Sequence, residues 1–235
     1  PALFDYFLEH NMLSHLWRIL AHHATPSAVK VQLLQTLALL LQNLEQGPSV
    51  YYILSNDHIN ELIRHPFDFD DEELLTQYVS LLKSIALRLD TSTVQFFIDA
   101  PIASAPPPAR ADERGDHEPP PPLPSLVPPP PSPPPKATQF AMFEALLNLW
   151  THEERMVRTA VRTAVLTICS LRDSAVQTYV LESPALPGVL VASLHGVGAQ
   201  LASCVALAKT SSSNERLQHL LDEVYFINDL LEAAD

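Results

Sequence analysis

Five acidic side chains crowd the stretch HPFDFDDEELL at 65–75, and carboxylates at this density could hold a metal ion or transfer protons. A calcium loop of the EF-hand type needs Gly at its sixth position and Glu at its twelfth. Counting from Asp68, neither position carries the required residue. Catalytic carboxylates need a second group held across a cleft, and the neighbouring sequence supplies no such partner. A helix start explains these acids better.

The helix-start interpretation accounts for each acidic position. Asp70 is predicted to be the N-cap residue, and Glu73, three residues later, to close a capping box. The other acids then lie in the first turn, where the helix dipole favours negative charge. Apolar side chains follow at helical spacing, which predicts a helix over 71–89 with one apolar stripe. The stripe consists of Leu74, Tyr78, Leu81, Ile85 and Leu89.

Three arginines form a second group with chemical potential. Arg155, Arg158 and Arg162 are spaced i, i+3 and i+7, so they form a basic stripe on one face of a predicted helix. Such a stripe could dock an acidic partner or lipid head groups. More often such a stripe pairs with nearby acids such as Glu153 and Glu154, or with acids of an adjacent helical repeat. The stripe is the candidate interaction site of this sequence.

Four histidines, His10, His15, His22 and His23, lie close together near the start of the chain. Zinc favours imidazole, but this spacing matches no standard site and no cysteine lies nearby. The chain also lacks a Gly-rich phosphate loop, a G-x-S-x-G motif, an H-E-x-x-H motif and paired CxxC motifs. We therefore expect exposed histidines, no metal, no cofactor, no small-molecule substrate and no catalytic activity.

The charge balance is acidic, with 14 Lys and Arg against 27 Asp and Glu and a formal charge of -13. Nucleic-acid phosphates are bound by clustered basic side chains, so nucleic acid is not an expected partner. Cys169 and Cys204 both lie in apolar helical stretches, which favours a reducing compartment over a disulfide-bonded secreted protein. The chain begins with Pro and shows no signal-peptide pattern, so we expect a segment of a longer protein.

The composition changes sharply between 101 and 135, which hold 16 of the 22 prolines. Proline at this density excludes helix and sheet and predicts polyproline II or disorder. The tract is either a boundary between two domains or an insertion within one. Two segments have the form that WW or SH3 domains bind, although such matches also arise by chance in a proline-rich spacer. They comprise Pro121, Pro122, Leu123 and Pro124, and Pro131, Pro134 and Lys136.

Both flanks of the tract show helical spacing and no convincing two-residue alternation, so the predicted class is all-α. The segments WRILAHHATPSAVKVQLLQTLALLLQNL and LLNLWTHEERMVRTAVRTAVLTICSL share a first helix, a polar turn with His, and a long helix opened by Val. Such pairs must stack, which predicts a HEAT/armadillo-like α-solenoid interrupted by a disordered proline-rich insertion. In the longest helix, the face of Val29, Leu33, Leu37, Leu40 and Leu44 is expected to be apolar. Helices are predicted at 2–9, 11–22, 27–44, 56–64, 71–89, 92–98, 139–150, 154–171, 174–181, 187–208 and 214–233.

The segment 183–208 carries no formal charge over 26 positions, a length that could span a membrane. Large residues follow one stripe, and small residues such as Ala192 and Gly196 line the other side, which suits close packing in lipid or in a protein core. Pro184, Pro187, His195 and Gln200 lower its hydropathy. We expect a buried solenoid helix, with a membrane-spanning helix as the alternative.

Several blocks of this sequence carry a family resemblance: FDYFLEHNML, VQLLQTLALLLQN, SVYYILSND, FDFDDEELLTQYVSLLKSIALRL, TVQFF, MVRTAVRT and YFINDLL. In this order they resemble the FPL domain of the C-type lectin domain family 16 member A and Transparent Testa 9 proteins. The resemblance covers about 1–98 and 139–235. It implies that 1–100 and 139–235 are two parts of one helical domain and that 101–138 is a proline-rich insertion.

The resemblance also implies a function. The family is associated with endosome and lysosome or vacuole maturation and with autophagy, so we expect a non-enzymatic scaffold that recruits trafficking or autophagy machinery. Its expected location is cytoplasmic and peripheral to endosomal, lysosomal or Golgi membranes. Because animal relatives are linked to a ubiquitin ligase, the alternative is a regulatory subunit of an enzyme complex of that kind. The expected partners are other proteins.

Overall fold

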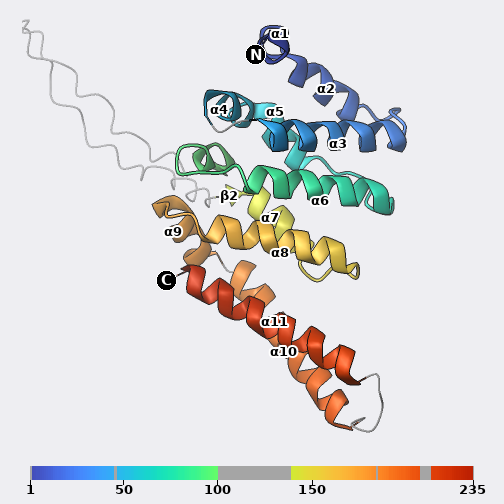
Figure 1. The fold of residues 1–235 in the computed structure, drawn as a ribbon, viewed down its shortest axis with the longest axis vertical. Coiled ribbons are helices and arrows are strands. Elements are labelled where there is room, and N and C mark those ends of the chain that lie inside the picture. The colour runs from blue at the N-terminus through green and yellow to red at the C-terminus, as the bar shows by residue number, and fades with distance from the viewer. Residues whose placement is uncertain (1, 45–46, 100–138, 184, 207–212, 235) are drawn as a thin grey trace, which may run out of the picture.

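Helices stacked in successive layers make up nearly all of the structure, a computed structural model that describes residues 2–44, 47–99, 139–183, 185–206 and 213–234 (Figure 1). The all-α prediction is confirmed, apart from two strands of two residues each. The elements are α1 (Ala2–Glu9), α2 (Met12–Ala21), α3 (Ser27–Asn43), α4 (Pro48–Leu54), α5 (Asp57–Arg64), α6 (Glu72–Ala86), a 3-10 turn (Val94–Phe97), β1 (Ile98–Asp99), β2 (Gln139–Phe140), α7 (Ala141–Asn148), α8 (Arg155–Cys169), α9 (Ser174–Glu182), α10 (Ala185–Ala206) and α11 (Ser213–Ala234).

The long helices α3, α6 and α8 lie side by side, and α10 and α11 form a hairpin at the far end from α1 (Figure 1). The buried side chains reflect this stacking of the helices. The predicted stripe from Leu74 to Leu89 is buried throughout, and so are Leu75, Val79 and Leu82 on the other side of α6. The helix itself ends at Ala86 and not at 89 as predicted, so Leu89 is buried from the segment that follows it. The helix is buried on both sides because α3 packs on one of its flanks and α8 on the other.

The predicted face of α3 is wrong by about one helical position. Val29 is 42% exposed, whereas Val31, Leu34 and Leu41 are buried. Apolar residues surround this helix almost completely, so spacing alone did not identify the face that packs against α6. Leu37 belongs to both faces and is buried as expected.

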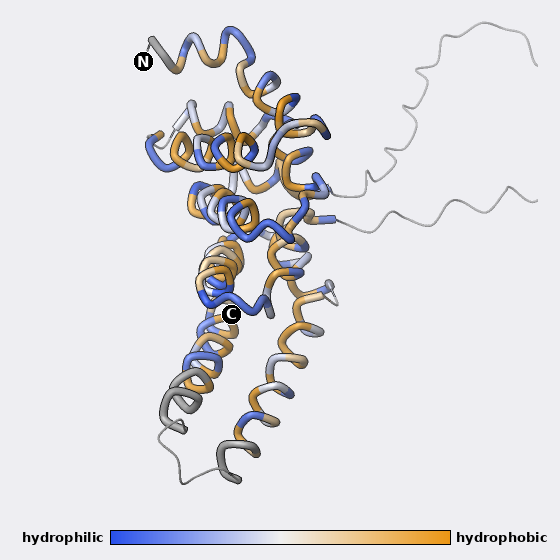
Figure 2. The backbone as a smooth tube through the Cα atoms, turned by 90° about the vertical axis from the view of Figure 1, so that its right-hand side faces the viewer, coloured by the Kyte–Doolittle hydropathy of each residue, from blue (hydrophilic) through white to orange (hydrophobic). Residues whose placement is uncertain are grey.

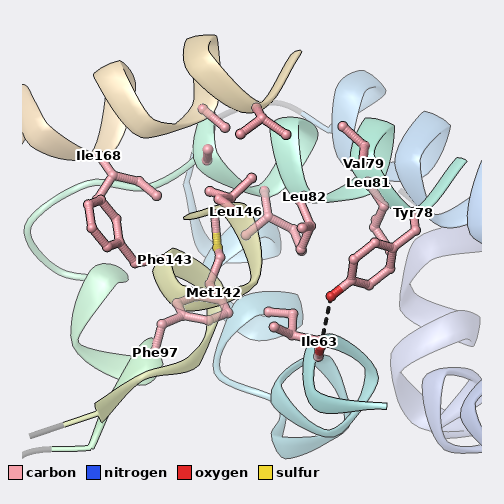
Figure 3. Close-up of a cluster of buried hydrophobic side chains, with 14 of the residues drawn as sticks. Ile63, Tyr78, Val79, Leu81, Leu82, Phe97, Met142, Phe143, Leu146 and Ile168 are labelled. Atoms are coloured by element: carbon pink, nitrogen blue, oxygen red, sulfur yellow. Dashed lines mark hydrogen bonds between the residues drawn. The ribbon is translucent and has the colours of Figure 1, made fainter. Parts of the chain in front are cut away.

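One continuous buried cluster joins the elements before and after the proline tract. Phe97, from the 3-10 turn, and Phe143, from α7, lie in it beside side chains of α6 and α8 (Figure 3). The hydroxyl of Tyr78 donates to the Ile63 carbonyl oxygen at 2.8 Å, so this buried phenol keeps a hydrogen bond (Figure 3). The two flanks therefore share one core.

Three elements differ from the predictions: α4, the 3-10 turn, and β2, which takes the first two residues of the helix predicted at 139–150. The helix α4 was not predicted, although Gly47 and Pro48 are a helix-start signal: Gly47 has φ +133°, which favours glycine, and Pro48 is the first helical residue. The helix predicted at 92–98 is instead a short 3-10 turn that leads into β1. The strands pair antiparallel, with Ile98 opposite Phe140 and Asp99 opposite Gln139.

Deletion of 103–135 is expected to leave the fold intact. The antiparallel pairing holds Asp99 and Gln139 side by side, and a short loop is enough to join two such strands. Closing a long loop costs little more free energy than closing a short one, so its removal changes stability only slightly. Thermal melts of the two forms should nearly coincide. A large loss of helical signal on deletion would show that the tract is a structural part of the domain.

Candidate functional site

The acidic stretch caps a helix, but the capping residue is Asp71 and not Asp70, so the predicted N-cap is wrong by one position. The Asp71 carboxylate accepts from the backbone N–H groups of Glu73 at 3.0 Å and Leu74 at 3.1 Å. Glu73 is therefore the second helical residue, which does not suit a capping box. The Ser27 hydroxyl of α3 also donates to Asp71, a contact that local sequence could not reveal.

Asp71→Ala is expected to lower the melting temperature by about 2–4 °C, while Asp70→Ala changes it little, because Asp71 alone caps α6.

The stabilisation by Asp71 depends on pH. Hydrogen bonds from Ser27 and from the Leu74 and Glu73 N–H groups lower the pKa of Asp71. A lowered pKa stabilises the fold above the ordinary aspartate pKa of about 3.9. This contribution is lost as the pH falls through the folded-state pKa. Melts of parent and Asp71→Ala should therefore converge in acid; an equal difference at every pH would contradict this assignment.

The three arginines of the predicted stripe lie on α8 but occupy different environments. Arg155 is exposed at the first turn of the helix. Arg158 is half-buried, and its Nη1 donates to the carbonyl oxygens of His152 and Glu153, at 2.6 Å each. Arg162 is ion-paired through Nη2 to Glu223 of α11, 61 residues away. The three arginines therefore do not form one uniform basic stripe. Arg155 stays exposed, whereas Arg162 is bound to a neighbouring helix.

Trp150, two residues after the end of α7, connects the end of the stack to the α10–α11 hairpin. Its side chain is 1% exposed, and its Nε1 donates to the Ser193 hydroxyl of α10 at 2.8 Å. Its ring packs edge-on against Phe226 of α11, with centroids 5.2 Å apart. The Arg162 guanidinium lies 5.7 Å from the Trp150 ring centroid and 5.2 Å from that of Phe226, within cation–π distance. This Trp150 junction joins α8, α10 and α11.

A cleft of about 400 Å³ opens beside the Trp150 junction, between α8 and α10. Its volume is in the range of ligand sites on proteins. Gly196 forms part of its α10 side, and a Cβ placed there would meet no atom within 4 Å, so this side is open. The residues that line it include Trp150, Arg158, Arg162, Gly196, Gln200 and Glu223.

Sequence reasoning found two of these lining residues, Arg158 and Arg162, and missed the others. Trp150 could have been noticed as one of two tryptophans, placed at the end of a predicted helix. Glu223 could not have been paired with Arg162, because no local spacing relates them. The small residues of α10 were noticed as a packing stripe and were not connected to the arginines.

The prediction that α10 is a buried solenoid helix is wrong. Of Ala185–Ala202, 11% of residues are buried, and Leu194 is half exposed. Among the described helices, α10 is the one long and apolar enough to cross a membrane by length and composition. Its partner α11 carries Asp229 and Glu232, which would be costly to bring into lipid. Figure 2 shows this largely apolar helix extending away from the rest of the stack.

The remaining candidates contribute no assembled site in the described residues. Both His22 and His23 are exposed and stack on each other, and His10 stacks on Tyr6. In the part of the chain that the structure describes, no group of three or more His, Cys, Asp or Glu side chains could hold a metal. The proline-rich ligand candidates at 121–124 and 131–136 lie outside the described residues.

Cys169 is expected to resist thiol reagents in the folded protein. Its side chain is 5% exposed, and burial raises its pKa to about 12, so the reactive thiolate is scarce at neutral pH. In a Cys204→Ser variant, which isolates this thiol, an aromatic disulfide reagent at pH 8 should label Cys169 only after denaturant is added. Rapid labelling of the native variant would show that the end of α8 opens readily.

Comparison with known proteins places this fold in a family. A model of the FPL family, described as an uncharacterised conserved protein, matches residues 1–169, well over half of the chain. The chain belongs to the FPL family. The resemblance inferred from the ordered sequence blocks is therefore confirmed, and the matched range ends at Cys169, the last residue of α8.

The relatives of this FPL chain come from animals and plants. It is 32% identical to human protein CLEC16A over 238 residues, which cover 98% of this chain and 19% of the human protein. It is 30% identical to the Drosophila melanogaster CLEC16A homolog over 236 residues, covering 97% and 19%. It is 31% identical to Arabidopsis thaliana TRANSPARENT TESTA 9 over 184 residues, covering 78% and 18%. The chain therefore spans about a fifth of the length of these relatives.

Proposed function

We propose that this FPL chain is a non-enzymatic scaffold, a HEAT/armadillo-like solenoid that recruits trafficking or autophagy machinery in endosome–lysosome or vacuole maturation. The observation that carries the proposal is the shared family: the human and Drosophila melanogaster CLEC16A proteins align with nearly the whole chain. Its expected location is cytoplasmic, at the surface of endosomal, lysosomal or Golgi membranes.

The arrangement of the helices supports a scaffold. Stacked helix pairs bury their shared faces and leave an extended outer surface, which is the part that solenoid proteins use for binding. Exposed large side chains are spread over that surface and not gathered in one deep pocket. Tyr52 in α4 is 62% exposed, Met156 in α8 is 72% exposed and Tyr225 in α11 is 65% exposed. Aromatic and Met side chains of this kind are enriched where proteins contact one another.

Affinity capture tests the proposal. The tagged chain is expressed in cells, and the proteins that it retains are identified by quantitative mass spectrometry against a tag-only control. We expect enrichment of vesicle-trafficking or autophagy proteins. Enrichment of a ubiquitin ligase in their place would favour the alternative of a regulatory subunit. Retention of neither class would overturn the proposal.

A further inference from the structure

The cleft between α8 and α10 contains a guanidinium with hydrogen-bonding capacity to spare. Arg158 uses Nη1 for both of its carbonyl acceptors, and its Nε and Nη2 have no acceptor among the described residues. Arg162 is neutralised by Glu223, so Arg158 gives the cleft its excess positive charge. A basic cleft on a chain of net charge -13 is a local exception that favours an anionic ligand.

The α10 side of the cleft is small and uncharged. Ala192, Ser193, Gly196, Val197 and Gln200 line it, at spacings that place them on one helix face. Helix α10 contributes no charge, and the open space at Gly196 admits a side chain from outside. The Trp150 ring lies at the base of the cleft and is almost fully covered, so the accessible apolar surface is that of Ala192 and Gly196. An apolar group can therefore lie beside the guanidinium, and the Gln200 amide can pair with a peptide group.

The charges around the cleft distinguish a carboxylate from a phosphate or an anionic membrane. Arg162 and Glu223 cancel each other, so one excess positive charge, that of Arg158, faces the cleft. Helix α11 also carries Asp229 and Glu232. One positive charge balances a single carboxylate, whereas a doubly charged phosphate or a negative lipid surface would leave negative charge uncompensated near the acids of α11. A carboxylate next to an apolar side chain, as in an acidic peptide, matches both the excess guanidinium and the apolar surface.

We propose that the cleft between α8 and α10 binds an acidic peptide segment of a partner protein, with one carboxylate on Arg158 and an adjacent apolar side chain against Ala192 and Gly196. This inference deepens the proposed scaffold function by naming the chemistry of a partner at one site, and it rests on that function. It assigns the recognition of the carboxylate to Arg158, while Arg162 holds the hairpin to α8.

The test begins with selection from a displayed library of random heptapeptides. Peptides are selected on the parent chain and counter-selected on Gly196→Leu, which fills the open side of the cleft. Gly198→Leu is the matched control, because it adds the same side chain to the same helix, also meets no atom within 4 Å, and does not line the cleft. We expect the recovered peptides to be rich in Asp and Glu next to Leu, Ile or Phe. Failure to enrich any sequence, or recovery of neutral or basic ones, would overturn the proposal.

Binding of the selected peptide is then measured by the fluorescence of Trp150 in a Trp17→Phe background, which removes the other tryptophan. Arg158→Gln and Gly196→Leu should each weaken binding about tenfold or more. Arg155→Gln and Gly198→Leu should leave it unchanged. Equal losses in both glycine variants would overturn the proposal, as would loss of binding in Arg155→Gln equal to that in Arg158→Gln.

Two further arms separate the sources of an anion. Inorganic phosphate and vesicles of phosphatidylcholine with phosphatidylserine are tested against the parent and Gly196→Leu. Binding of either that is stronger than that of the peptide and lost in Gly196→Leu would overturn the assignment to a peptide. Selection in vitro requires no cellular machinery, so its failure and a failure of affinity capture are distinguishable.

Discussion

Replacing Trp150 by Ala is expected to lower the free energy of unfolding by about 3–5 kcal/mol, the usual range for truncating a buried tryptophan. The indole is 1% exposed and contacts three elements: it donates to Ser193, packs on Phe226 and lies within cation–π distance of Arg162. Its removal leaves a void where α8, α10 and α11 meet. Urea denaturation followed by circular dichroism measures the loss.

Two variants control the Trp150 experiment. Trp17→Ala removes the same side chain from a position that is only partly buried, where it meets His65 edge-on, so its cost should be clearly smaller. Trp150→Phe keeps a ring but loses the donor to Ser193, which should cost on the order of 1 kcal/mol. If Trp150→Ala cost no more than Trp17→Ala, the Trp150 junction would not be holding the hairpin in place.

Breaking the ion pair between Arg162 and Glu223 is the second large effect. Glu223→Gln leaves the guanidinium enclosed without its counter-charge, and the loss of one partner from a buried pair costs about 3–5 kcal/mol. The side chains are 15% and 25% exposed, so solvent screening places the expected loss at the lower end of that range. Arg162 Nε and Glu223 Oε2 are already buried without partners, so neither charge has a substitute bond in the described structure.

A double-mutant cycle isolates the ion-pair term. Arg162→Met and Glu223→Gln are measured singly and together, and the double variant should lose less free energy of unfolding than the two single losses added, by about 0.5–3 kcal/mol. Arg155→Met, an exposed change on the same helix, should lie within about 0.5 kcal/mol of the parent. Strictly additive losses would show that the pair does not couple α8 to α11.

Local patterns in the sequence predicted the elements well where a helix had one clear polar face or a side-chain start signal. The predicted stripe from Leu74 to Leu89 is buried as expected, although α6 ends at Ala86. The acidic start of that helix was recognised, but Asp70 and Asp71 offer the same capping oxygen. The backbone turn at 69–71 and the Ser27 hydroxyl decided between them, and Ser27 comes from another helix.

The two short strands show what local pattern could not reveal. β1 and β2 are two residues each, and neither has a period that could be detected. They exist because the shared core brings Ile98 and Phe140 together across the proline tract. The face of α3 was missed for a related reason: apolar residues surround the helix, so only its packing against α6 selected the buried side.

The sequence by itself determined the helical class, the family, the uncharged character of α10 and the basic stripe of Arg155, Arg158 and Arg162, since all of these follow from residue types at short range. Tertiary structure alone decided that the arginines would separate, with Arg162 held by Glu223 of α11 and Arg158 lining a cleft. It also decided that α10 would be exposed and not buried. The physical reason is that ion pairing and burial depend on which surfaces meet, and these surfaces come from helices up to 61 residues apart.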